Sequence, residues 1–305
     1  MNSPLAWLPA FGLLRFGGAD AVQFLQGQIS NDARRLALGE SLLAAYSTPQ
    51  GRVIAVLHLL PHASGILAVL PQELVEPVAA RLRKFVLRAK VEITNVGETL
   101  CVAGAHSVAD PSRAALAIPA GRTYLESDGL GIAAVTGDAG RYWVIGTPDR
   151  VASHSDEITL QRDSAADAAE HAWRLADIRA GLAQVYGATS ELFVAQMLNL
   201  DLLGGISFTK GCYTGQEIVA RTQHLGRIKR RMLRLELPRG EFQRGAAVRL
   251  PDGRSGRVTE LAATGDGFEA LAVMSLEPGE AEDRDGVAVA VRELPLPYSL
   301  VAAAS

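Results

Sequence analysis

The C-terminal part of the chain consists of short apolar runs separated by turns, a pattern that only a sheet accommodates well. Five runs of strand length follow residue 227, broken by Gly, Pro and Asp: Met232–Leu237, Ala246–Leu250, Gly256–Ala262, Ala270–Met274 and Val287–Val291. Runs of this length between turn residues are typical of strands and short for helices. The sequence therefore predicts a small β-rich domain over residues 226–305.

The preceding residues mix two periodicities. Helices are predicted to begin at Asp20 and to cover Glu73–Arg88 and Ser164–Ala180, where apolar residues share one face. Strand patterns lie between them, at Leu13–Phe16, Ser41–Tyr46, Arg52–Leu60, Val91–Thr94, Leu100–Gly104 and Tyr142–Ile145. Pro49-Gln50-Gly51 has the chemistry of a tight turn and predicts a hairpin between the strands on either side.

Length and composition exclude several classes of protein. A chain of 305 residues is long enough for one large or two to three small domains. Its net charge of -3 gives no global basic field, so nucleic-acid binding would need clustered cations. Two cysteines, Cys101 and Cys212, are too few for a disulfide framework and suit a reducing compartment. With no signal-peptide pattern and no apolar run near the ~20 residues of a membrane span, we expect a cytoplasmic protein without membrane contact.

One segment combines residue types that carry chemistry. Gly204–Glu217 contains four glycines, a lysine and a cysteine. Glycine-rich turns let the backbone approach a ligand closely. The segment is not a P-loop, because Lys210 precedes Gly211, whereas a P-loop places glycine before lysine and Ser or Thr after it. Nucleoside triphosphate binding is therefore disfavoured.

Thr214 and Glu217 have the spacing of a capping box, which predicts a helix directly after this segment. Cys212 would then lie just before a helix N-terminus, where free N–H groups and Lys210 favour the thiolate and lower the cysteine pKa. Lys210 and Cys212 are therefore the candidate catalytic residues. Structural interpretations stand beside this one, since a lone cysteine is commonly a small buried apolar residue, and Glu217 and the glycines can serve the turn alone.

The octapeptide Lys210–Glu217, followed by Arg221, resembles the signature of the YgfZ family, which is related to the T-protein (aminomethyltransferase) of glycine cleavage. The resemblance extends over most of the chain, through Phe24–Gln28, Gly51-Arg52, Lys84–Arg88, Gln196–Phe208 and Leu294–Leu300. It implies an α+β fold like that of the T-protein, with three domains in a ring around a central folate pocket and a barrel-like C-terminal domain. The expected domains are 1–48 with 163–225, then 49–162, then 226–305.

The resemblance also implies a function. Members of the family bind tetrahydrofolate and support the assembly or repair of iron–sulfur enzymes, including enzymes that modify tRNA, so client enzymes or assembly proteins are the expected partners. Folate is expected against the aromatic rings of Trp173 and Phe11, because a flat ring can stack on a pterin. Trp173 fits the buried face of an amphipathic helix equally well. The remaining residues expected to bind folate are Gly211, Gly215, Gln216, Glu217 and Arg221.

An aminomethyltransferase is the first alternative. A T-protein-like enzyme needs an acidic residue soon after the glycine turn, but Gly51-Arg52-Val53 is followed by Ile54, Ala55 and Val56. Without that carboxylate no general base is evident, so catalytic turnover is in doubt. Two cysteines cannot hold a four-thiolate cluster. No stably bound metal is therefore expected, and Cys212 is predicted to act as a reactive thiol or as a transient ligand shared with a partner.

A tRNA-binding module is the second alternative. Residues 218–235 contain six cations and no acid: Arg221, Arg227, Lys229, Arg230, Arg231 and Arg234. Guanidinium groups bind RNA phosphate, and they would also suit the glutamate tail of folate. Strand alternation would place Lys229 and Arg231 on a solvent face. Arg221 is then the member of this cluster expected beside the binding site.

Overall fold

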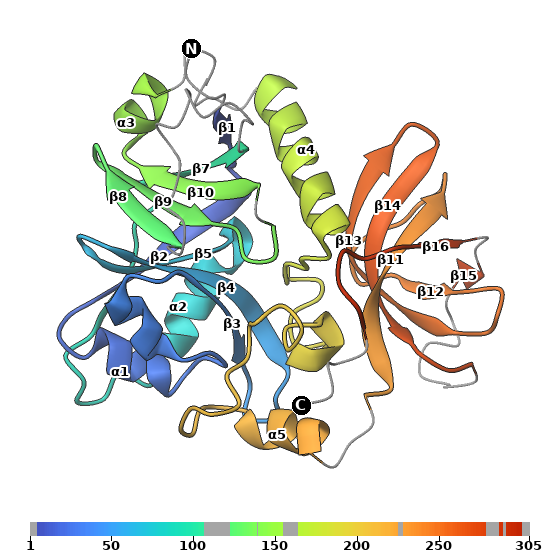
Figure 1. Ribbon diagram of the computed structural model, residues 1–305, viewed down its shortest axis with the longest axis horizontal. Coiled ribbons are helices and arrows are strands. Elements are labelled where there is room, and N and C mark those ends of the chain that lie inside the picture. The colour runs from blue at the N-terminus through green and yellow to red at the C-terminus, as the bar shows by residue number, and fades with distance from the viewer. Residues whose placement is uncertain are drawn as a thin grey trace.

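The computed structural model describes residues 5–106, 123–138, 140–154, 164–224, 228–278, 287–288 and 291–300. Its strands form three sheets, two on the left of Figure 1 and one on the right, with a long helix between them. The α+β class is confirmed. None of the helices in the described part of the chain is long and apolar enough to span a membrane.

The first sheet contains five antiparallel strands in the order β3-β4-β5-β2-β6. Their bounds are Leu42–Ser47 (β3), Val53–His62 (β4), Gly65–Pro71 (β5), Phe11–Gly17 (β2) and Glu92–Asn95 (β6). The predicted hairpin is confirmed, since β3 and β4 pair across the Pro49–Gly51 turn, where Gly51 has a φ of +71°. The expected domain boundary after residue 48 falls inside this hairpin, so the residues on both sides of it share one sheet.

The second sheet also contains five antiparallel strands, in the order β1-β7-β10-β9-β8. Their bounds are Leu5–Trp7 (β1), Cys101–His106 (β7), Arg141–Gly146 (β10), Leu130–Ala134 (β9) and Tyr124–Ser127 (β8). Strand β10 leads into the short helix α3, Pro148–Ser153, which is capped by the Thr147 hydroxyl.

Helices cover the sheets and link them. The N-terminal half contains α1 (Ala21–Gln26), the 3-10 turns Ala33–Leu38 and Gln72–Leu74, and α2 (Val75–Arg83). The later helices are α4 (Ser164–Ala180), which has the predicted bounds, the 3-10 turn Ala195–Leu198, and α5 (Gln216–His224).

Helix α2 ends five residues before the predicted Arg88. Beyond its end, Lys90 N–H donates to Asp20 Oδ2 at 2.7 Å, and Lys90 O accepts from Asp20 N–H at 3.3 Å. These hydrogen bonds hold Lys90 next to Asp20, the residue that precedes α1. Contacts between elements distant in sequence therefore end a helix whose local pattern would continue.

The C-terminal sheet has six strands in the order β15-β12-β13-β14-β11-β16. Their bounds are Val287–Ala288 (β15), Ala247–Arg249 (β12), Ser255–Thr264 (β13), Gly267–Ser275 (β14), Arg230–Pro238 (β11) and Arg292–Leu294 (β16). The prediction of a β-rich domain is confirmed, but its barrel-like form is wrong: the sheet is open. Its two edge strands are only two and three residues long in the described part of the chain, and they do not pair with each other.

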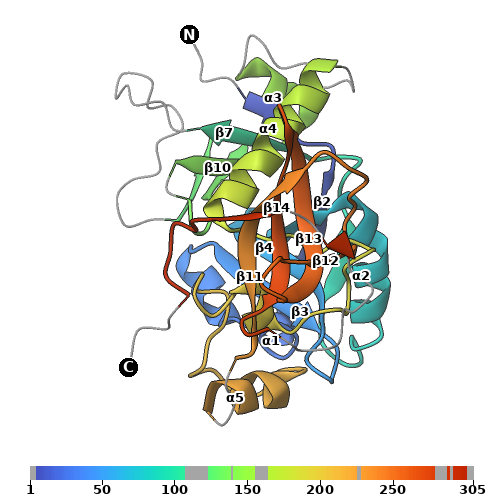
Figure 2. The same ribbon diagram turned by 90° about the vertical axis from the view of Figure 1, so that its right-hand side faces the viewer.

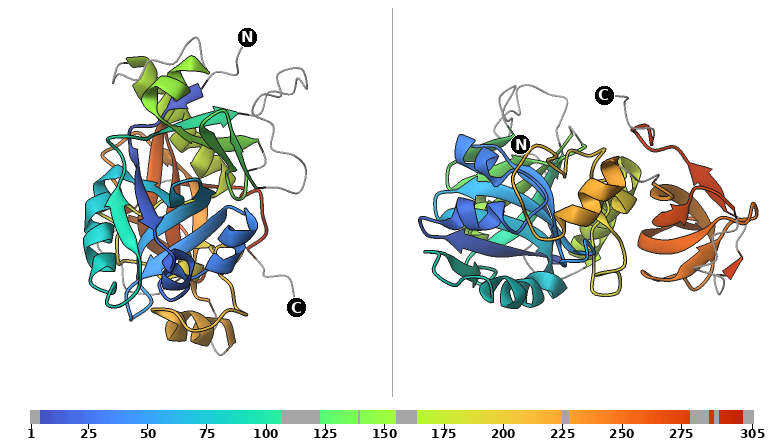
Figure 3. Two further views of the ribbon diagram at one scale, coloured as in Figure 1. Left: turned by 90° about the vertical axis from the view of Figure 1, so that its left-hand side faces the viewer. Right: turned by 90° about the horizontal axis from the view of Figure 1, so that it is seen from below.

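Both faces of the C-terminal sheet are buried, which explains the apolar runs in its sequence. Met232 and Leu271 point into the core shared with the N-terminal sheets and α4, whereas Leu233 and Ala270 point into a second core on the opposite face. Figures 2 and 3 show this sheet beside α4, with the two N-terminal sheets on the far side of the helix.

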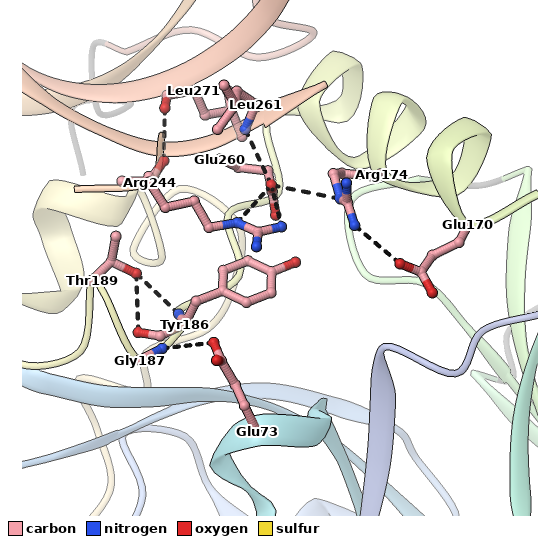
Figure 4. Close-up of polar contacts among 11 residues, drawn as sticks. Glu73, Glu170, Arg174, Tyr186, Gly187, Thr189, Arg244, Glu260, Leu261 and Leu271 are labelled. Atoms are coloured by element: carbon pink, nitrogen blue, oxygen red, sulfur yellow. Dashed lines mark hydrogen bonds and ion pairs between the residues drawn. The ribbon is translucent and has the colours of Figure 1, made fainter. Parts of the chain in front are cut away.

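A polar network fixes the C-terminal sheet to the rest of the molecule (Figure 4). The Glu260 carboxylate is buried, and Oε1 accepts from Arg244 at 2.8 Å and lies 3.8 Å from Arg174 of α4. The Arg244 guanidinium lies 3.4 Å from the centre of the Tyr186 ring. Arg174 also pairs with Glu170, which accepts from Ala10 N–H. One chain of contacts therefore runs from the C-terminal sheet through α4 to the N-terminal segment.

Candidate functional site

The Lys210–Glu217 segment, here called the signature loop, leads directly into α5, as predicted. The expected capping box does not form: no hydrogen bond joins Thr214 and Glu217 among the described residues. Gly215 has a φ of +84°, outside the helical range, so Thr214 cannot be the capping residue. Gln216 takes the acceptor role expected of Glu217, because its Oε1 accepts from the N–H of Tyr213, three residues before it, at 3.2 Å.

Lys210 is buried and holds the signature loop in place. Its ammonium group donates to Ile29 O at 2.7 Å and to Asn31 O at 2.8 Å, and it lies 4.8 Å from the centre of the Tyr213 ring. Only 5% of the residue is exposed. Desolvation lowers the pKa of Lys210 to about 8, opposed in part by the charge of nearby Asp32. The predicted catalytic residue therefore fastens the loop to the segment after α1.

Cys212 is exposed and free, two residues beyond the buried Lys210. Gly211, Glu217 and Arg221 are exposed as well, and Gln216 is partly buried. The loop therefore presents its thiol to solvent from a fixed base. Cys101, the other cysteine, is partly buried in β7, and burial raises the pKa of its thiol to about 11.

The other predicted site residues lie in a different part of the molecule. Phe11 of β2 and Trp173 of α4 both contact Trp143 of β10: each ring centre lies 5.0 Å from the Trp143 ring centre. His58 of β4 lies 5.0 Å from the same ring. We call these four residues the tryptophan cluster. Trp173 is 1% exposed, and its indole packs against Gly104. Any larger residue there would clash with it, because a Cβ atom on Gly104 would lie 2.3 Å from the indole.

The tryptophan cluster is surrounded by buried polar groups that the sequence did not reveal. The Arg141 guanidinium lies 4.5 Å from the centre of the Trp173 ring, and its Nη2 lies 2.7 Å from Asp177 Oδ1. Burial raises the pKa of Asp177 to about 7, although Arg141 acts in the opposite direction. Burial, with a smaller contribution from Arg141, lowers the pKa of His58 to about 3, so the imidazole is neutral.

Four polar atoms around the tryptophan cluster are buried without a hydrogen-bond partner. One of them, Arg141 Nη2, has the ion pair with Asp177, and the other three are Trp143 Nε1, Trp173 Nε1 and Gln184 Oε1. The amide nitrogen of Gln184 does have a hydrogen-bond partner, since it lies 2.7 Å from His58 Nε2. An unsatisfied buried polar atom costs about 1–3 kcal/mol. Two donors and one acceptor in this part of the core are therefore unsatisfied.

A pocket of about 590 Å³ opens beside the cluster. One face of α4 lines it with Leu175, Ala176 and Arg179, and Pro297 closes it from the C-terminal segment. His106 and Asp138 also line the pocket. His106 lies 5.9 Å from the Trp173 ring centre, and Asp138 Oδ2 accepts from Arg141 Nε at 2.8 Å. These two residues connect the pocket wall to the cluster.

Two members of the predicted basic cluster over residues 218–235, Arg231 and Arg234, are engaged in ion pairs. Arg231 donates to both oxygens of Asp201, at 2.6 and 2.8 Å, and is 3% exposed, so its predicted solvent-facing position is wrong. The cause is that both faces of the C-terminal sheet are buried. Arg234 pairs with Glu269. Arg221 remains exposed, whereas Arg227 lies outside the described residues.

No group of three or more His, Cys, Asp or Glu side chains that could hold a metal ion occurs among the residues that the structure describes.

The chain is similar to several curated proteins named tRNA-modifying protein YgfZ. It is 30% identical to the one from Escherichia coli O45:K1 (strain S88 / ExPEC), over 97% of this chain and 93% of the relative. It is 30% identical to that of Hamiltonella defensa subsp. Acyrthosiphon pisum (strain 5AT), over 79% of this chain and 70% of the relative. No protein-family model matches the chain.

The fold resembles the crystal structure of glycine cleavage system aminomethyltransferase T from Bartonella henselae. The two share a TM-score of 0.61 at 17% identity, over 90% of this chain and 79% of the other. This likeness confirms the predicted T-protein-like fold.

Proposed function

The chain belongs to the YgfZ family, and from this membership we propose that it binds tetrahydrofolate and supports the assembly or repair of iron–sulfur enzymes, including enzymes that modify tRNA. Its proposed partners are those enzymes or their assembly proteins, with transient contact to tRNA, in the cytoplasm. One observation carries the folate part: two indole donors of the tryptophan cluster and the neighbouring acceptor of Gln184 are buried and unpaired, and a pocket lies beside the cluster.

These groups fit a pterin. A pterin is flat, with ring nitrogens and a carbonyl that accept hydrogen bonds and an amino group that donates them. The indole N–H groups of Trp143 and Trp173 suit its acceptors, and Gln184 Oε1 suits its donors. A pocket of about 590 Å³ is within the usual range for a ligand of this size.

The rim of the pocket suits the acidic tail of folate. Arg179 and Arg234 both pair with the single carboxylate of Glu269, at 2.7 and 2.6 Å. The three side chains together retain one positive charge. The Arg179 side chain is 54% exposed and lines the pocket, so it is the cation we assign to the carboxylates of the tail.

The exposed thiol of Cys212 supports the iron–sulfur part. A thiol on a firmly held loop can reach a cluster or a thiol of a partner protein, whereas the thiol of Cys101 is partly buried. The test uses a strain that lacks its own copy of the gene. Cys212→Ser should fail to restore iron–sulfur enzyme activity, and Cys101→Ser, the matched control, should restore it. Full restoration by Cys212→Ser would remove the thiol from the proposal.

A one-carbon transferase is the second candidate, and Asp177 is the observation that favours it. Ile54, Ala55 and Val56 are buried in β4 and provide no carboxylate. Asp177 provides one beside the tryptophan cluster, and with its pKa raised to about 7 by burial it can exchange a proton near neutral pH. Methylene-tetrahydrofolate formed from an aminomethylated lipoyl carrier, and lost in Asp177→Asn, would establish this function. The leading proposal predicts no product.

A further inference from the structure

The segment that follows α2, Lys84–Lys90, exposes both apolar and basic side chains; we call it the basic loop. Leu87 is 87% exposed and Phe85 is 49% exposed, among the most exposed large apolar residues in the described chain. Isolated exposed apolar residues are common, but here the two are adjacent to cations on both sides.

The cations of the basic loop differ from those of residues 218–235. Lys84, Arg88 and Lys90 are exposed, and their side chains form no ion pair or hydrogen bond with the rest of the described structure. Arg231 and Arg234, by contrast, pair with buried or partly buried acids. In a protein with a net charge of -3, the basic loop is thus a local site of unneutralised positive charge.

The loop is held in place, so its side chains project from a fixed backbone. The backbone N–H of Lys90 donates to the Asp20 carboxylate, and the Lys90 carbonyl accepts from the Asp20 N–H. The chain also packs closely here, since a Cβ atom on Gly18 would lie 2.1 Å from Lys90 O. Val86 packs against the main core. Two acids next to the loop have partners of their own: Asp20 accepts from the backbone N–H of Lys90, and Glu92 pairs with Arg15.

We propose that the basic loop docks RNA, with Lys84, Arg88 and Lys90 against phosphates and the Phe85 ring under an unpaired base. The proposal deepens the tRNA contact of the proposed function and rests on it. Cations supply sequence-independent affinity for the RNA backbone, and an exposed aromatic face stacks on any base. The loop lies beside α1, on the side of the molecule away from the C-terminal sheet (Figures 1 and 3).

Fluorescence anisotropy with labelled unfractionated tRNA tests the proposal. The triple variant Lys84→Gln/Arg88→Gln/Lys90→Gln should bind at least tenfold more weakly at low salt. The slope of log K against log salt should fall by about 2 to 3, the contribution of three phosphate contacts. The matched control, Arg34→Gln/Arg239→Gln/Arg292→Gln, removes the same charge from exposed residues that are paired with acids elsewhere, and it should bind like the wild type.

Phe85→Ala should weaken binding of a single-stranded oligouridine about tenfold, the effect of losing one stacked base, and should leave duplex RNA binding unchanged.

Equal losses in both triple variants, or no tRNA binding by the wild type at low salt, would overturn the proposal. Binding to anionic phospholipid vesicles without binding to RNA would also overturn it. Folate titration of the Lys84–Arg88–Lys90 triple variant separates the two proposals: folate binding should persist, and a failure of folate binding in the wild type would leave the RNA result unaffected.

Discussion

Gly215 of the signature loop lies against Gly51 of the β3–β4 turn, backbone to backbone. A Cβ atom on Gly215 would lie 3.0 Å from Gly51 Cα and 2.6 Å from Thr48 O, whereas one on Gly51 would lie 2.8 Å from Ile218 Cβ. Both glycines have a positive φ, +84° and +71°. Two segments that the sequence marks separately are therefore one structural unit, with Cys212 at its surface.

Gly215→Ala should lower the free energy of unfolding by about 1–3 kcal/mol, because the new methyl group is disfavoured at positive φ and meets the Thr48 carbonyl. Urea denaturation measures this. Gly211→Ala is the control: a Cβ atom there has nothing within 4 Å. It should change stability by less than about 0.5 kcal/mol. Equal stabilities of the two variants would contradict the tight contact between the turn and the loop.

The two cysteines should differ strongly in reactivity. At pH 8 the folded protein should react rapidly with an aromatic disulfide reagent at one thiol per chain, that of the exposed Cys212. Burial raises the pKa of Cys101 to about 11, so little thiolate is present there at pH 8. Cys212→Ser should abolish the fast reaction, and Cys101→Ser should preserve it. Two thiols reacting at the same rate would be inconsistent with the partly buried position of Cys101 and its raised pKa.

Lys210 should make stability depend on pH above about 8. Its pKa is 10.5 in the unfolded chain and about 8 in the native protein. Between these values the native state binds fewer protons, so rising pH stabilises it, by up to about 3 kcal/mol by pH 10.5. Below pH 8 both states are protonated and this contribution is constant.

Lys210→Met should remove this dependence while lowering stability at every pH, because Ile29 O and Asn31 O lose their donor. Urea denaturation of both proteins from pH 7 to pH 10.5 gives the comparison. Parallel stability curves for the variant and the wild type would show that the Lys210 pKa is not lowered.

The buried pair Arg231–Asp201 should matter far more than an exposed one. Asp201→Asn leaves the Arg231 guanidinium, 4% exposed, without its counter-charge, and about 3–5 kcal/mol of stability should be lost. Glu236→Gln, at the exposed pair with Arg292, should cost less than about 1 kcal/mol. Thermal unfolding of the two variants tests the difference.

The elements that local patterns determine were predictable from the sequence. Helix α4 has its predicted bounds, and the β3–β4 hairpin follows from the Pro49–Gly51 turn. The end of α2 was not predictable, because it depends on hydrogen bonds between Asp20 and Lys90, which are distant in sequence. The burial of Arg231 was missed for the same reason: strand alternation does not reveal that both faces of a sheet are covered.

The candidate site was predictable only in part. The sequence marked Trp173 and Phe11 but gave no indication that Trp143 lies between them. Asp177 had one usable signal, since its position four residues after Trp173 places both on one face of a helix. The pairing of His58 with Gln184 had none, because it joins a strand to a loop that only the fold brings together.

Calorimetric titration with tetrahydrofolate tests the folate proposal most directly, using Trp173→Phe and Trp7→Phe as a matched pair. Phenylalanine keeps a ring in the core but lacks the indole N–H. If Trp173 Nε1 bonds to the pterin, Trp173→Phe should weaken binding about tenfold, whereas Trp7→Phe, outside the tryptophan cluster, should bind like the wild type. Unchanged affinity in Trp173→Phe, or no binding by the wild type, would contradict a folate site at the tryptophan cluster.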